Sequence, residues 1–138
     1  MKPITKKLLW TAFILVVVKL FLVLLIQTPT IFADEYVYAK NAQSFWNEGV
    51  FETHGDPDIS YPPLYPVLLS ITYLFQDMTL VYFFMKFLNV LLTTLVIIPT
   101  YLLAKDFVKE KQAYLIALLV SIMPISLIYP AYLMSENI

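Results

Sequence analysis

The sequence contains no cysteine and no arginine, and only two of its 138 residues are glycine. Without cysteine the chain forms neither a disulfide nor a thiolate metal site. Without arginine it has no bidentate guanidinium clamp for phosphate, and two glycines are too few for a phosphate-binding glycine loop. Nine lysines against ten acidic residues give a net charge of −1, so the basic footprint of a nucleic-acid-binding protein is missing.

Charged residues are also scarce, at 14% of the chain against 60% hydrophobic residues. Soluble domains have about 25% charged residues, so this composition indicates a membrane protein. Four apolar stretches cover residues 8–26, 64–75, 80–104 and 113–134. The first, third and fourth are long enough to cross a bilayer, whereas the second is too short by itself. We predict an all-α membrane protein with three to four transmembrane helices, in which 62–75 forms a short helix.

Lysines flank the first apolar stretch and indicate its orientation. Lys2, Lys6 and Lys7 precede it, and lysines favour the cytoplasmic side. The stretch is longer than the apolar core of a cleaved signal peptide, so we interpret it as an uncleaved anchor with a cytoplasmic N-terminus. The acid-rich segment 27–63 then forms an external loop, and we expect a multi-pass protein of the cell membrane.

The lysines further along the chain leave two topologies open. Lys105, Lys109 and Lys111 favour a cytoplasmic position for the connection 104–112. That position requires the short helix 62–75 to be re-entrant or interfacial. If this helix crosses the bilayer completely, the connection lies outside instead. The charge rule favours the first topology.

The external loop is predicted to contain a helix at the membrane surface. Asp34 is a suitable N-cap for a helix over residues 35–48 that stops at Gly49. Tyr36 and Trp46 belong to this helix, and such aromatic residues favour the interface between bilayer and water. The sequence thus predicts an interfacial helix in the first external loop.

The order of several short motifs resembles that of a known enzyme family. An acidic pair with an aromatic residue and an alanine comes after the first span, and a "PPL" motif follows. These motifs are Asp34-Glu35-Tyr36, Ala39, Tyr61–Leu64, Lys86–Asn89 and Tyr129–Glu136. They resemble the N-terminal part of the GT-C glycosyltransferases, which include protein O-mannosyltransferases and aminoarabinose transferases of the family 39 type.

The resemblance implies a membrane glycosyltransferase whose donor is a polyprenyl-phosphate-linked sugar. The acceptor hydroxyl, on a lipid, a glycan or a protein, is expected at the outer membrane face. Asp34 matches the residue that acts as the base toward that hydroxyl. Relatives carry lysine or histidine directly before "PPL", whereas this chain has Tyr61, which donates a hydrogen bond but no charge. Residues 1–138 correspond to the N-terminal region of such an enzyme, and this region alone is expected to be inactive.

The remaining candidate site residues are titratable groups at or near the outer loop. Lys86 lies within an apolar stretch, where an ionisable residue is a functional candidate, although it can also snorkel to the interface. His54 and Tyr61 are further candidates for holding the donor phosphate. Glu35 is predicted either to orient the acceptor or hold a metal, or to serve only as a favourable negative charge at the N-terminus of the helix. Glu136 reaches the site only if the last span ends outside.

The segment 53–60 is predicted to be a turn-rich loop. His54, Asp56 and Asp58 in this loop have a spacing that fits a cation site, but a solvated turn is the better interpretation. No cofactor is assigned, and participation of a divalent cation stays open. The alternative function is a small non-catalytic integral membrane protein that binds a lipid or a partner subunit, with Asp34 serving only as a helix cap.

Overall fold

A computed structural model describes residues 3–26, 33–57 and 61–133 of the chain. The helices are α1 (Pro3–Leu24), α2 (Ala33–Glu48), α3 (Leu64–Ser70), α4 (Met78–Leu95), α5 (Ile97–Ala104), α6 (Glu110–Ser121) and α7 (Pro124–Ile128), with two 3-10 turns, η1 (Ile71–Leu74) and η2 (Tyr129–Ala131). A small hairpin joins β1 (Glu52–Thr53) to β2 (Asp56–Pro57). The predicted all-α fold is therefore confirmed.

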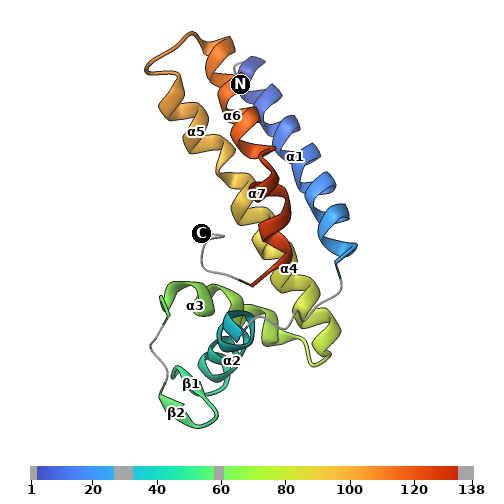
Figure 1. Cartoon of the computed structure of the whole chain (residues 1–138), viewed down its shortest axis with the longest axis vertical. Coiled ribbons are helices and arrows are strands. Elements are labelled where there is room, and N and C mark those ends of the chain that lie inside the picture. Colours follow the sequence, from blue (N-terminus) through green and yellow to red (C-terminus); the bar gives the residue numbers. More distant parts are fainter. Residues whose placement is uncertain (1–2, 27–32, 58–60, 134–138) are drawn as a thin grey trace.

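The helices form a long bundle with a smaller group of elements at one end (Figure 1). The bundle consists of α1, α4, α5, α6 and α7, and α2, α3, η1 and the hairpin form what we call the platform. The N-terminus and the α5–α6 connection lie together at the opposite end (Figure 1). We call that end the lysine end, because it carries the following lysines: Lys6, Lys7, Lys105, Lys109 and Lys111.

Two helical segments are long and apolar enough to cross a bilayer. Among the described residues these are Ile4–Leu24 and Met78–Ala104. The pair α6 and α7–η2 passes the same criterion only when it is taken as one span, and it is bent by 58°. The helix over Leu64–Leu74 is shorter, and at about 1.5 Å per residue it falls short of the bilayer core of about 30 Å. These lengths indicate a membrane protein.

The stretch predicted as one helix over residues 80–104 is divided into α4 and α5. The break is at Val96, three residues before Pro99. Proline has no N–H to donate to the carbonyl four residues earlier, and its ring clashes with that carbonyl. This carbonyl belongs to Leu95, where α4 ends. The Thr100 amide resumes the helical pattern by donating to the Val96 carbonyl at 3.1 Å.

The predicted span over residues 113–134 is likewise interrupted. It is divided into α6, which ends at Ser121, and α7, which begins at Pro124. Proline is well suited to the first turn of a helix but not to its interior, so the chain bends here. Beyond the bend, Ser126 accepts a hydrogen bond of 2.9 Å from the Lys19 ammonium of α1. Lys19 itself is completely buried.

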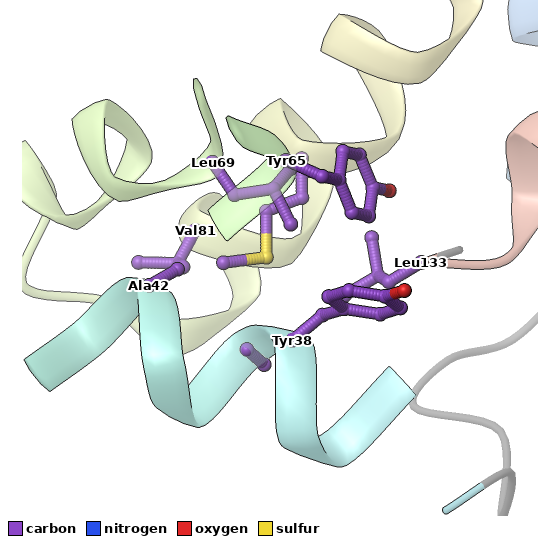
Figure 2. Packing of buried hydrophobic residues seen from close by; sticks show 8 residues of the cluster. Tyr38, Ala42, Tyr65, Leu69, Val81 and Leu133 are labelled. Atoms are coloured by element: carbon purple, nitrogen blue, oxygen red, sulfur yellow. The ribbon is translucent and has the colours of Figure 1, made fainter. Parts of the chain in front are cut away.

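The core that positions the platform lies between three helices (Figure 2). Tyr38 and Ala42 come from α2, Tyr65 and Leu69 come from α3, and Val81 comes from α4. Figure 2 also places the side chain of Leu133, from the segment after η2, beside the two tyrosines. Packing against these large apolar side chains fixes both α2 and α3 on the start of α4.

The helix predicted over residues 35–48 is present but begins earlier. It starts at Ala33 and ends at Glu48, and Gly49 follows with φ +73°, the left-handed conformation that commonly ends helices. The predicted stop at Gly49 is confirmed. The prediction that Asp34 is the N-cap is wrong, because Asp34 lies inside the first helical turn.

The loop predicted over residues 53–60 overlaps the β1–β2 hairpin, which runs from Glu52 to Pro57. Glu52 pairs with Pro57 and Thr53 with Asp56. Between them, His54 and Gly55 have φ values of +59° and +85°, as a tight two-residue hairpin turn requires. The turn was expected from the sequence, whereas the strand pairing was not.

Candidate functional site

Asp34 and Tyr61, the two main candidates from the resemblance, are in contact. The Tyr61 hydroxyl donates a hydrogen bond of 2.5 Å to Asp34 Oδ1, across 27 positions of sequence. Both residues are partly exposed. Asp34 lies in the first turn of α2, where the helix dipole stabilises a negative charge. The platform therefore presents a carboxylate that is held by a phenol and reachable from outside the fold.

The Asp34–Tyr61 pair packs on two buried tyrosines, Tyr38 and Tyr65. The Tyr38 ring lies 4.9 Å from the Tyr61 ring and 5.0 Å from the Tyr65 ring, edge-on to the latter. Tilted and edge-on contacts are favourable arrangements for aromatic rings. The Tyr65 hydroxyl in turn donates to Asn89 Oδ1 of α4 at 2.9 Å. A continuous set of contacts thus links the position of Tyr61 to the bundle.

Glu35 is turned toward the interior of the protein and is completely buried. Its charge acts on the side chains of Lys86 and Tyr82, which both belong to α4. A buried carboxylate is retained where a nearby cation compensates its charge. Glu35 of α2 thus lies near Lys86 and Tyr82 of α4, and its predicted role toward acceptor or metal stays a prediction.

Lys86 is also buried, with 5% of its surface exposed. Its ammonium donates a hydrogen bond of 2.6 Å to the carbonyl of Ile26, just after the last turn of α1. Carbonyls at the C-terminal end of a helix lack partners within the helix, and a lysine satisfies them well. Lys86 therefore joins α4 to the end of α1, close to Glu35. Its predicted contact with a donor phosphate stays a prediction.

His54 lies at the exposed tip of the hairpin. Its Nε2 is 3.2 Å from the Tyr36 hydroxyl, and the two rings stack with centroids 5.6 Å apart. The Lys40 ammonium lies over the Tyr36 ring, 5.9 Å from its centre. The structure thus places His54 against Tyr36, the residue after Glu35, on the exposed side of α2.

Two other candidates cannot be placed. Glu136 and Asp58 lie outside the described residues. Within the described part of the chain, no three histidine, aspartate or glutamate side chains come together to hold a metal ion.

Asn89 was not predicted as a site residue, although it is completely buried at the base of this region. Besides accepting from Tyr65, its amide donates to the carbonyl of Tyr132 at 3.0 Å. The signal in the sequence was an amide inside an apolar stretch, where a polar side chain needs a partner. Asn89 holds α3 and the segment after η2 on α4.

Tyr73 is a second residue that the sequence did not single out. Its hydroxyl donates to the Ala39 carbonyl of α2 at 2.8 Å. Burial raises the pKa of Tyr73 well above its ordinary value, and the nearby Tyr82 adds to the effect. The phenol is therefore protonated at neutral pH and donates to the Ala39 carbonyl of α2.

The arrangement offers the accessible carboxylate of Asp34 and the Tyr61 phenol that is hydrogen-bonded to it. Lys86 and Glu35 are the buried charged side chains of this region. Such a carboxylate can accept a proton from a hydroxyl group, and the phenol can donate to an anionic oxygen. No protein-family model, curated protein or solved structure matches this chain.

Proposed function

We propose that this chain is the N-terminal region of a membrane glycosyltransferase of the GT-C type. The enzyme transfers a sugar from a polyprenyl-phosphate-linked donor to an acceptor hydroxyl. The observation that carries the proposal is the hydrogen bond between Tyr61 and Asp34. These are the residues at the "DE" and "PPL" motifs of the resemblance, and a purely accidental likeness gives no reason for them to meet.

In the proposed reaction Asp34 acts as the general base. Its carboxylate accepts the proton of the acceptor hydroxyl while the acceptor oxygen attacks the anomeric carbon of the donor sugar. The bond from that carbon to the phosphate oxygen breaks, and the lipid phosphate leaves with the electron pair. Tyr61 orients the carboxylate, and Lys86 supplies positive charge near the leaving phosphate.

The proposed membrane arrangement has three spans, formed by α1, α4–α5 and α6–η2. The platform lies at the outer face, with α2 at the interface and Trp46 exposed on it. The N-terminus and the α5–α6 connection lie at the same end of the bundle (Figure 1). This common position supports a cytoplasmic lysine end, and α3–η1 then stays on the outer side. The cell membrane is the proposed location.

Replacement of Asp34 by asparagine tests the proposed base. The amide keeps the size of the carboxylate and an oxygen for the Tyr61 hydrogen bond, but it takes up no proton. In the complete enzyme that contains this region, we expect D34N to lower sugar transfer by about 10²–10⁴-fold in membranes supplied with a polyprenyl-phosphate sugar, with little change in donor binding. The matched control is D56N, which changes an exposed carboxylate on the hairpin. A wild-type rate for D34N would remove Asp34 from the reaction.

One observation favours the alternative, a non-catalytic membrane protein that binds a lipid or a partner subunit. Lys86 already donates to the Ile26 carbonyl, and this contact explains the lysine by folding alone. The two functions predict different results for Lys86→Met. A donor-binding lysine gives weaker binding of the polyprenyl-phosphate sugar in K86M, whereas a purely structural lysine gives lower thermal stability with unchanged binding.

A further inference from the structure

The lysine end carries an apolar groove directly beside a cationic side chain. Lys6 is three and four residues before Leu9 and Trp10, and these are four and three residues before Phe13, so the four side chains lie along one face of α1. Leu9, Trp10 and Phe13 line a shallow groove, and the rings of Trp10 and Phe13 meet edge-on at 6.0 Å. Trp10 is 67% exposed. Within the described part of the chain, this face is not covered by another helix.

The end of the bundle that carries this groove is positively charged. Lys7 lies 4.3 Å from the centre of the Tyr114 ring of α6, which brings α6 and the α5–α6 connection beside the start of α1. The connection and the first turn of α6 add three exposed lysines. Among the described residues at this end, five lysines face only two acids, Asp106 and Glu110, and Glu110 accepts from the Tyr101 hydroxyl at 3.2 Å.

We infer that this end of the protein binds an anionic phospholipid. The phosphate of the headgroup lies at Lys6, and an acyl chain lies in the groove of Leu9, Trp10 and Phe13. A free anion gains nothing from contact with the apolar groove, and a zwitterionic lipid carries no net charge that would attract it to the lysines. Lysines at a membrane surface each favour anionic lipid by about fivefold.

This inference does not depend on sugar transfer. The groove and the lysines lie at the end of the bundle opposite to the platform that carries Asp34 and Tyr61 (Figure 1). It needs only that α1 lies in the bilayer, which its length and composition indicate.

The two tryptophans of the chain allow a direct test, because one lies at each end. In the variant W46F, Trp10 is the only tryptophan that fluoresces, and in W10F that tryptophan is Trp46. Each is reconstituted in bilayers that contain dibrominated phosphatidylglycerol or dibrominated phosphatidylcholine, whose bromine atoms quench tryptophan on contact. We expect phosphatidylglycerol to quench Trp10 with a severalfold preference, which disappears in 1 M salt. Trp46 is expected to show no such preference.

Substitutions of Lys6 and of a distant lysine provide the controls, all in the W46F background. K6Q is expected to reduce the preference of Trp10 for phosphatidylglycerol by about fivefold, and K6R to keep it. K40Q, which removes a lysine of the platform, is expected to leave it unchanged. Equal quenching by both lipids would overturn the inference, as would an unaltered preference in K6Q. Loss of the preference on addition of inorganic phosphate at constant ionic strength would also overturn it, because the site would then take the free anion.

Discussion

The Asn89 side chain, buried in α4, hydrogen-bonds to two other segments of the chain. It accepts from the Tyr65 hydroxyl of α3 and donates to the Tyr132 carbonyl after η2. A buried polar group costs free energy when its partner is removed. One amide therefore holds together three segments that carry or support the candidate site.

Replacement of Asn89 by leucine is expected to destabilise the protein by about 1–3 kcal/mol. The physical reason is that the Tyr65 hydroxyl and the Tyr132 carbonyl lose this partner in a buried environment. Thermal unfolding in detergent measures the effect. N47L, which makes the same change at an exposed position of α2, is expected to stay within about 0.5 kcal/mol of the wild type. Similar values for both variants would contradict the role of Asn89.

At this scale the sequence indicated candidate site residues, but not the partners that these side chains contact in the fold. Asp34 and Tyr61 were both expected, because each belongs to a recognisable motif. The contact between them depends on how α2 packs on α3, which no local pattern specifies. The partner of Lys86 is a backbone carbonyl, and a carbonyl gives no signal in a sequence. Asn89 belongs to one motif of the resemblance and stands in an apolar stretch, but the sequence predicted no role for it.

The start of α4 illustrates how a single element is fixed. Asp77 is the N-cap of this helix and accepts hydrogen bonds from the amides of Thr79 at 2.7 Å and Leu80 at 3.3 Å. The hydrogen bonds from Thr79, and that from the Leu80 amide, lower the pKa of Asp77 below its ordinary value. Because the folded-state pKa is the lower one, this cap stabilises the protein above the ordinary pKa of an aspartate, and the stabilisation is lost as the pH falls through the folded-state value.

A comparison of wild type with D77N isolates this effect. Asparagine is an equally good N-cap, but it does not titrate. We expect the two proteins to differ in melting temperature by a constant amount near neutral pH. Below the ordinary pKa of aspartate the wild type loses stability relative to D77N. Melting temperatures measured as a function of pH provide the test, and a difference that does not change with pH would contradict it.

At the scale of elements, the apolar stretches predicted where helices occur but not where they break. Pro99 and Pro124 were visible in the sequence, but proline acts on the carbonyl four residues earlier, and the surrounding packing decides whether the helix bends or ends. The start of α2 at Ala33 was missed because Asp34 is as acceptable in the first turn of a helix as at its cap. The hairpin was missed because its strands have two residues each.

For the whole molecule, the central question is which end faces the cytoplasm. The chain has no cysteine, so a single introduced thiol reports its position without background. We expect E48C, on the platform, to react with an impermeant maleimide in intact cells. Q112C, at the lysine end, is expected to react only after permeabilisation. Both positions are exposed in the fold.

The same measurement distinguishes the two topologies that the sequence left open. If α3–η1 crossed the bilayer completely, Q112C would react from outside together with E48C. If E48C reacted only after permeabilisation, the platform would face the cytoplasm and the proposed external reaction would be wrong. The charge pattern favoured one topology, and the short helix over Leu64–Leu74, whose length the sequence also predicted, is in line with it.

The hydrogen bond from Lys19 to Ser126 has a consequence for how the protein assembles. The helix is interrupted before Pro124, so the direction of α7 is not determined by the backbone of α6. The contact with α1 contributes to that direction. This contact forms only when α1 is already in place. Synthesis from the N-terminus makes α1 before α7, which is the order that the contact needs.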